Sequence, residues 1–166
     1  MGLLEPHGRG RRPFRRDALS EPGSAPAIVV HSLTHAVAAL KAAAAADREI
    51  VLLSAAGAGV YAGAGWWKAV IDAAREAAPG ARFSHILDCG DAAGAVQAAL
   101  RAGVEAAIFT GRPDVAERLA AIAEARGSRL LTARPQPALD LAVCFFANAE
   151  TLRRRVADVL ASLPPV

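Results

Sequence analysis

The sequence predicts a single three-layer α/β/α domain built on a mostly parallel sheet of five or six strands. From Ala27 onward, short apolar runs of strand length alternate with longer segments in which apolar residues recur every three or four positions. This alternation implies right-handed βαβ crossovers, which make neighbouring strands parallel. The run Ile50–Leu53 is apolar at every position, which is typical of a parallel strand covered on both faces. A partial (βα)-barrel is the alternative architecture.

The chain of 166 residues has the length of one domain, which we place at residues 26–163. Residues 1–25 are rich in Gly, Pro, Ser and Arg, and this composition predicts a disordered basic leader. A basic arm that touches nucleic acid or an anionic lipid surface is one interpretation, and a solvated tail is the one that the composition favours. On the second interpretation, deleting residues 1–24 should leave the melting temperature within about 2 °C.

Strands and helices are predicted in strict alternation along the domain. The predicted strands are Ala27–Val30, Ile50–Leu53, Arg82–Leu87, Ala106–Phe109 and Arg129–Leu131, with Leu139–Phe146 as a sixth strand or a buried connector. The predicted helices cover residues 35–47, 66–78, 91–103, 113–126 and 148–160.

Several residues mark the ends and faces of these helices. Ser32 or Thr34 suits the first helix start, Asp91 the third and Pro113 the fourth, while Gly103 and Gly127 are typical of helix ends. In the second helix the apolar face consists of Trp67, Val70, Ile71 and Ala74. Trp66 lies about 100° from that face, so we expect Trp67 in the core and Trp66 at its periphery.

A glycine-rich loop between the strand at 50–53 and the next helix is the strongest functional signal. Such a loop lets the backbone approach a ligand closely, and the following helix start offers unpaired N–H groups to an anion. Ligands of parallel sheets bind at the carboxyl ends of the strands, where other polar residues of this chain also fall. The predicted ligand-binding residues are Gly57, Gly59, Gly63, Gly65, Asp88, Thr110, Gly111, Arg112 and Arg134.

Three residues at strand ends are the catalytic candidates, namely His31, Asp88 and Cys89. If the first and third strands are close, His31 and Cys89 would form an imidazole–thiolate pair, whereas a lone cysteine at a strand end is otherwise a small buried apolar residue. Asp88 is a candidate base. His85 alternates with Phe83 along its strand, which favours a packed histidine.

Two stretches resemble known families. Gly59, Gly63 and Gly65 form a GxxxGxG pattern that resembles the nucleotide loop of short-chain dehydrogenases, in which Asp88 would take the place of the ribose-binding acid. The stretch DCGDAAGAVQAALRAGVEAAIFTG is similar to βα units of phosphate-binding (βα)-barrel enzymes of the aldolase kind. These resemblances imply a Rossmann-like or barrel-like fold and a nucleotide or another phosphate-bearing ligand, without fixing a cofactor. The dehydrogenase Tyr-x-x-x-Lys pair and a strand-end lysine are both missing.

The composition of the chain argues against several classes of function. Cys89 and Cys144 are the chain's two cysteines, which form neither a disulfide framework nor a metal knuckle, and the basic residues are nearly all arginine. We expect a cytoplasmic protein with no membrane span and no nucleic-acid partner. The leading expectation is a domain that binds a small anionic metabolite or nucleotide, with or without catalysis. The alternative is a non-catalytic module that acts in self-association or regulation.

Overall fold

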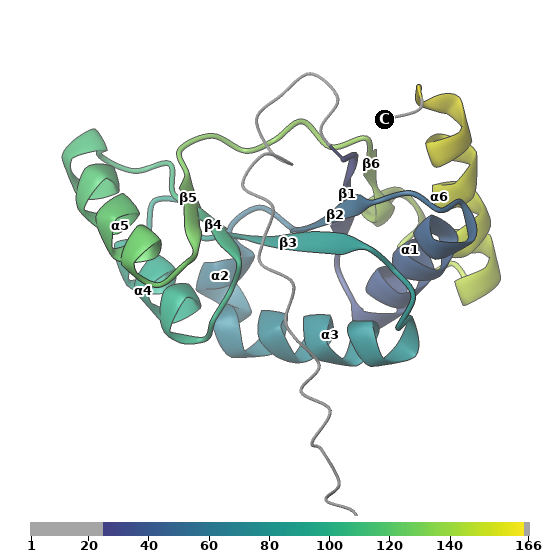
Figure 1. Cartoon of the computed structure of the whole chain (residues 1–166), viewed down its shortest axis with the longest axis horizontal. Helices are drawn as coiled ribbons and strands as arrows, with labels where there is room; N and C mark the ends of the chain where they lie inside the picture. Colours follow the sequence, from purple (N-terminus) through teal and green to yellow (C-terminus); the bar gives the residue numbers. More distant parts are fainter. Residues whose placement is uncertain (1–24, 165–166) are drawn as a thin grey trace, which may run out of the picture.

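A computed structural model describes residues 25–164 as one α/β domain, so the predicted basic leader falls almost entirely outside the described residues (Figure 1). The strands are β1 (Ala27–Val30), β2 (Ile50–Ser54), β3 (Phe83–Asp88), β4 (Ala106–Ile108), β5 (Arg129–Leu131) and β6 (Leu139–Asp140). The helices are α1 (Leu33–Ala45), α2 (Ala58–Tyr61), α3 (Gly63–Ala77), α4 (Ala93–Arg101), α5 (Pro113–Ala125), the 3₁₀ turn η1 (Leu141–Cys144) and α6 (Ala149–Ser162).

The six strands form one parallel sheet in the order β5-β4-β3-β2-β1-β6. The predicted α/β class with a parallel sheet and helices between strands is therefore confirmed, and it is consistent with a Rossmann- or flavodoxin-like fold. The first five strands step in one direction across the sheet, as they would in the alternative partial barrel. The sheet is nevertheless open, because β5 and β6 lie at opposite edges.

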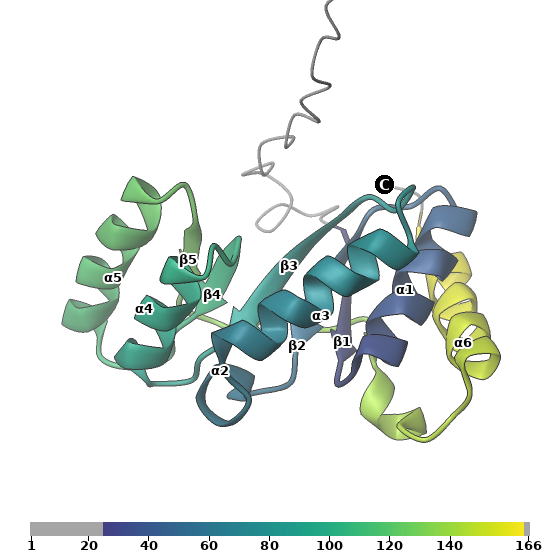
Figure 2. The ribbon, with the colours of Figure 1, turned by 90° about the horizontal axis from the view of Figure 1, so that it is seen from below.

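The layering differs from the prediction of three layers. Right-handed crossovers that all step the same way put all their helices on one face of the sheet. Figures 1 and 2 show this arrangement, with α1 and α3 on the same side of the strands, and α6 packs beside α1. Within residues 25–164 the helices thus form a single layer. A second layer would need crossovers that step in the opposite direction, and the only return step, from β5 to β6, contains no helix.

The helix layer and the sheet enclose the main core. Alternate strand residues such as Ile28, Leu52 and Leu87 point toward the helices and pack with Trp67 and Leu152. Trp67 is fully buried and Trp66 is only partly buried, which confirms the predicted phase of α3. His85 is also packed, with its ring 6.3 Å from that of Trp67. Burial lowers the pKa of His85 to about 3, so this imidazole is neutral at physiological pH.

The other face of the sheet carries a second apolar cluster, which we call the open face. It consists of Ala27, Val29, Val51, Leu53, Ile86, Ala106 and Ile108. The connector formed by residues 132–138 leaves β5 and returns to the far edge of the sheet to begin β6. Figure 1 shows it in light green, passing on the opposite side of the central strands from α3. The backbone N–H of Ala138 then donates to the carbonyl of Ala27.

Most predicted helix ends are confirmed. The Ser32 hydroxyl accepts a hydrogen bond from the His35 N–H, Pro113 opens α5, and Gly103 and Gly127 adopt positive φ beyond α4 and α5. The prediction that Asp91 caps α4 is wrong. The chain turns at Gly90 with φ of 54°, and α4 begins only at Ala93 without a side-chain cap. Asp91 therefore lies one residue before the cap position.

Candidate functional site

His31 and Asp140 form a hydrogen-bonded pair at the carboxyl ends of two neighbouring strands. His31 directly follows β1 and Asp140 ends β6, and these strands pair in parallel with Val29 opposite Asp140. The Nε2 atom of His31 lies 2.6 Å from Oδ1 of Asp140. Their side chains are 18% and 44% exposed, so the pair is accessible from solvent without being freely mobile. A carboxylate that holds one ring nitrogen orients an imidazole for proton transfer at the other.

A second histidine fixes the backbone around this pair. The N–H of His31 donates to Nδ1 of His35 over 3.3 Å, and Nε2 of His35 lies 3.2 Å from the carbonyl oxygen of Phe145. This network assigns the proton of His35 to Nε2. Burial lowers the pKa of His35, so its ring stays neutral and ties β1 to the segment after η1.

The acid of the pair is held in its charged form. Partial burial raises the pKa of Asp140, but the Ala142 N–H, the His31 ring and the nearby Arg134 guanidinium together outweigh that effect and lower it. The Ala142 N–H donates to Oδ1 over 2.9 Å. Asp140 is therefore a carboxylate at neutral pH. Within the described chain no hydrogen bond engages Nδ1 of His31, which leaves that nitrogen for a ligand.

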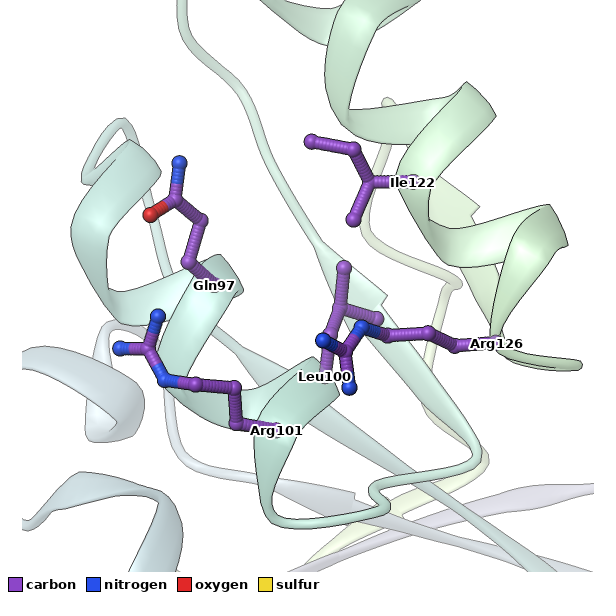
Figure 3. A pocket seen from close by; sticks show the side chains of 5 residues that line it. All are labelled: Gln97, Leu100, Arg101, Ile122 and Arg126. Atoms are coloured by element: carbon purple, nitrogen blue, oxygen red, sulfur yellow. The ribbon is translucent and has the colours of Figure 1, made fainter.

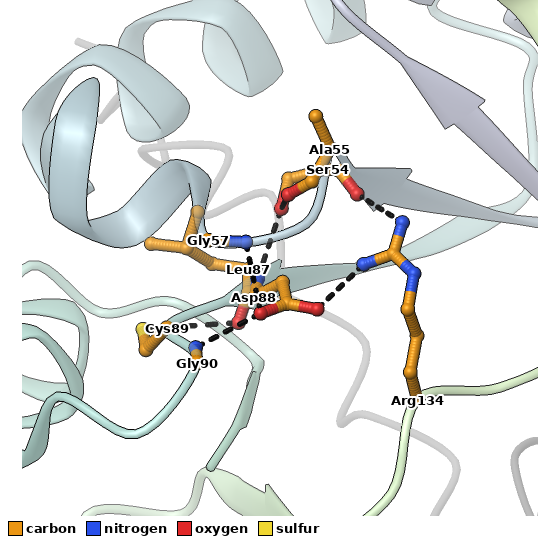
Figure 4. A network of polar contacts seen from close by, with 8 residues as sticks. All are labelled: Ser54, Ala55, Gly57, Leu87, Asp88, Cys89, Gly90 and Arg134. Carbon is orange, nitrogen blue, oxygen red and sulfur yellow. Dashed lines mark hydrogen bonds and ion pairs between the residues drawn. The ribbon is translucent and has the colours of Figure 1, made fainter. Parts of the chain in front are cut away.

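A second polar cluster lies at the ends of β2 and β3, centred on the Asp88 carboxylate (Figure 4). Oδ1 of Asp88 accepts from the N–H groups of Gly57 and Gly90, at 3.1 and 2.9 Å. Oδ2 accepts from Arg134 at 2.6 Å, and the same guanidinium donates to the Ser54 carbonyl at 2.7 Å. The Ser54 hydroxyl in turn accepts from the Asp88 N–H.

This cluster gives the glycine-rich loop a structural partner in place of the predicted ligand. The backbone N–H of the loop and an arginine do converge on an anion, but the anion is the protein's own Asp88 carboxylate. The side chain of Asp88 is only 7% exposed and that of Arg134 is 27% exposed. Arg134 thus anchors the connector of residues 132–138 to the ends of β2 and β3, and this favours a structural role for Asp88 and Arg134.

Two glycines of the loop serve different purposes. A Cβ atom at Gly59 would lie 2.6 Å from Sγ of Cys89 and 3.1 Å from the Asp88 carbonyl oxygen, so this glycine allows α2 to approach the end of β3. The close approach predicted for a ligand is therefore used inside the protein. Gly65 faces open space at the start of α3, and Gly63 also has open space but a φ of 87°.

We predict opposite effects for alanine at these two positions. Gly59→Ala should destabilise the fold by about 1–3 kcal/mol because the new methyl group overpacks against Cys89 and the backbone. Gly65→Ala should stabilise it by up to about 1 kcal/mol, since alanine is the better helix former. Chemical denaturation of both variants measures this difference. Equal free energies of unfolding would contradict the packing of α2 on β3.

Cys89 is placed as a packing residue. It is fully buried, and burial together with the neighbouring Asp88 charge raises the pKa of its thiol to about 12. A thiol with this pKa is not a thiolate near neutral pH, which argues against nucleophilic chemistry. Strand β2 lies between β1 and β3, and within residues 25–164 no hydrogen bond joins His31 to Cys89, so the imidazole–thiolate pair stays without support.

The remaining candidates follow β4. Arg112 is 79% exposed and donates two hydrogen bonds to Asp114, so its charge is partly engaged at the start of α5. A Cβ atom at Gly111 would lie 2.4 Å from the Phe109 ring, so close packing against this ring accounts for a glycine at position 111. Thr110 is exposed, and its N–H donates to the Gly90 carbonyl.

Sequence reasoning found His31 but missed Asp140 and His35. Asp140 is 109 positions from His31 and belongs to a strand of two residues, too short to show a periodicity. One signal was present, because Asp140 interrupts the apolar run LDLAVCFF, and a charged residue in such a run needs a partner.

Elsewhere, a shallow depression of about 250 Å³ lies between α4 and α5 (Figure 3). Gln97, Leu100, Arg101, Ile122 and Arg126 line it. These residues include none of the candidates named above and give the depression no evident chemistry.

In residues 25–164 there is no group of three or more His, Cys, Asp or Glu side chains arranged to hold a metal ion. None of the helices in that range is long and apolar enough to cross a membrane.

Comparisons with known proteins do not extend this description. A scan against protein-family models finds no match, and a search of curated proteins finds none either.

Proposed function

We propose that this protein binds a small anionic metabolite or nucleotide at the carboxyl ends of β1 and β6, and that His31 is the residue that exchanges a proton with it. The observation that carries this proposal is the 2.6 Å contact between His31 and the Asp140 carboxylate at the edge of the sheet where parallel folds bind ligands. Asp140 and His35 orient the ring and its backbone, and Nδ1 remains for the ligand.

The charge balance of the pair suits a ligand with an acidic group. An imidazolium forms when Nδ1 takes up a proton, from a singly protonated phosphate monoester or, when the ligand is a carboxylate, from water. The imidazolium then lies between the anionic group of the ligand and the Asp140 carboxylate. Each contact is then a charge-assisted hydrogen bond. The Asp88 cluster contributes rigidity, because Arg134 anchors the connector that leads into β6 and its charge also acts on Asp140.

We also propose that the protein is located in the cytoplasm. Cys89 and Cys144 are both free thiols, and unpaired cysteines are typical of reducing compartments.

We predict that replacing His31 removes ligand binding. The wild type is first screened by thermal shift against inorganic phosphate, pyrophosphate, adenine nucleotides, acetate and citrate, since a ligand raises the melting temperature by mass action. The best hit is then titrated against His31→Gln, Asp140→Asn and Arg112→Gln. His31→Gln should weaken binding at least about 10-fold, which is roughly the loss of one charge-assisted hydrogen bond. Asp140→Asn should weaken it less, and Arg112→Gln should leave it unchanged.

Two results would contradict this assignment. Full affinity in His31→Gln would remove the histidine from the site. Loss of affinity in Arg112→Gln alone would move the ligand to the end of β4, where the predicted ligand-binding residues Thr110, Gly111 and Arg112 lie.

A non-catalytic module for self-association is the second candidate, and one observation favours it. Val143, Phe145 and Phe146 are exposed around η1, with Phe146 at 95%. Exposed aromatic clusters mark interaction surfaces. Light scattering on the wild type and on Phe146→Ser tests this candidate, which requires an oligomer that the substitution dissociates. A screen without any hit, together with such an oligomer, would favour the module.

A further inference from the structure

The open face of the sheet requires a cover that the described helices do not provide. Val29, Val51, Leu53, Ile86 and Ile108 point away from the helix layer and are at most 1% exposed. Parallel sheets are stable with both faces covered, because their strands are apolar on both sides. Exposing these side chains to water would cost roughly 1.5–3 kcal/mol for each one.

The described residues opposite this face are few. Among the described residues outside the strands, Ala25 is the only apolar residue that packs on the cluster, and it is the first residue described. The connector of residues 132–138 crosses from β5 toward β6 on this side, but it is a single extended segment with Thr132, Ala133, Gln136 and Ala138 exposed. One such segment cannot bury a face that spans four strands.

We propose that residues 1–24 cover the open face. The segment leads directly into Ala25, which packs on the cluster. It is long enough, because 24 extended residues reach about 80 Å whereas four strands span roughly 15–20 Å. Its larger apolar side chains, Leu3, Leu4, Phe14 and Leu19, supply the contacts.

A role for residues 1–24 in covering the sheet is the opposite of the dispensable tail that their composition predicts. A Gly-, Pro- and Arg-rich segment does not form a core of its own, but it can add apolar side chains to a surface that the rest of the chain has built. The segment then stabilises the domain instead of being dispensable. The open face is separate from the proposed ligand site, because its residues include neither His31 nor Asp140.

The test compares the full chain with three variants. One lacks residues 1–24, one has Leu3, Leu4, Phe14 and Leu19 replaced by Ser, and the matched control has Arg9, Arg11, Arg12 and Arg15 replaced by Gln. Melting temperature, binding of a hydrophobic dye, light scattering and hydrogen exchange of β2 and β3 are measured on each. The first two variants should melt at least about 5 °C lower, bind more dye and lose protection in β2 and β3, whereas the control should stay within about 2 °C.

Two outcomes would overturn the proposal. A deletion variant with unchanged melting temperature, dye binding and exchange would show that the segment does not touch the sheet. A full chain that is a dimer, and whose deletion variant is an equally stable dimer, would show that a second copy covers the face. If the deletion variant does not fold, the proposal is tested by comparing the Ser variant with the Gln control. Equal losses of stability in these two variants would contradict the proposal.

Discussion

Replacing Asp88 with alanine is expected to lower the free energy of unfolding by about 3–5 kcal/mol, as is typical when one partner of a buried ion pair is removed. The substitution leaves the N–H groups of Gly57 and Gly90 and the guanidinium of Arg134 without their acceptor. It also removes one of the two contacts by which Arg134 anchors the connector, leaving only the hydrogen bond to the Ser54 carbonyl. Urea denaturation with the melting temperature as a second readout measures the loss.

Asp114 provides the matched control for this prediction. It too pairs with an arginine near a strand end, but Arg112 and Asp114 are 79% and 49% exposed. Removing such an exposed pair should cost no more than about 1 kcal/mol. Asp88→Asn keeps the shape of the side chain, and it replaces the alanine variant in the experiment if that variant does not fold. A cost for Asp88→Asn no larger than that of Asp114→Asn would contradict the central place of Asp88.

Replacing Trp67 with alanine is expected to cost about 3–5 kcal/mol, because the side chain is fully buried between α3 and the sheet and leaves a large cavity. The indole contacts the His85 ring, and its Nε1 has no hydrogen-bond partner within the described chain. Trp67→Phe should therefore cost much less, since it keeps most of the apolar volume and removes the unpaired donor.

Trp66 is the internal comparison for this second prediction. It is the neighbouring residue of the same type on the same helix, but it is only partly buried. Trp66→Ala should cost clearly less than Trp67→Ala in the same denaturation experiment. Equal costs, or the reverse order, would show that a different face of α3 packs on the sheet.

The fold could be predicted from sequence because its signals are local. Apolar runs such as Ile50–Leu53 and the spacing of Trp67, Val70 and Ile71 depend on neighbouring residues only. The number of layers could not be predicted in this way, because it depends on the direction in which each strand is added to the sheet. The strand order is set by contacts between distant segments, such as β6 beside β1.

The candidate site was only partly predictable for the same reason. His31 was found because it ends a recognisable strand, whereas Asp140 reaches it from a strand of two residues. The glycine loop was predicted to bind an external anion together with Arg112, whereas the Gly57 N–H donates to a carboxylate of the protein itself, which Arg134 also binds. Sequence could not show that this anion is Asp88, nor that Arg134 and not Arg112 is the arginine.

Proton exchange between His31 and a ligand at the ends of β1 and β6 would change the protonation of the His31 ring. Nitrogen-15 spectra of the histidine rings, recorded while the strongest ligand of the thermal-shift screen is added, test it most directly. We expect Nδ1 of His31 to change to the signal of a protonated nitrogen. His85, which is buried beside Trp67, should not change and serves as the internal reference. A ligand that binds to saturation while both ring nitrogens of His31 keep their signals would show that His31 exchanges no proton with it.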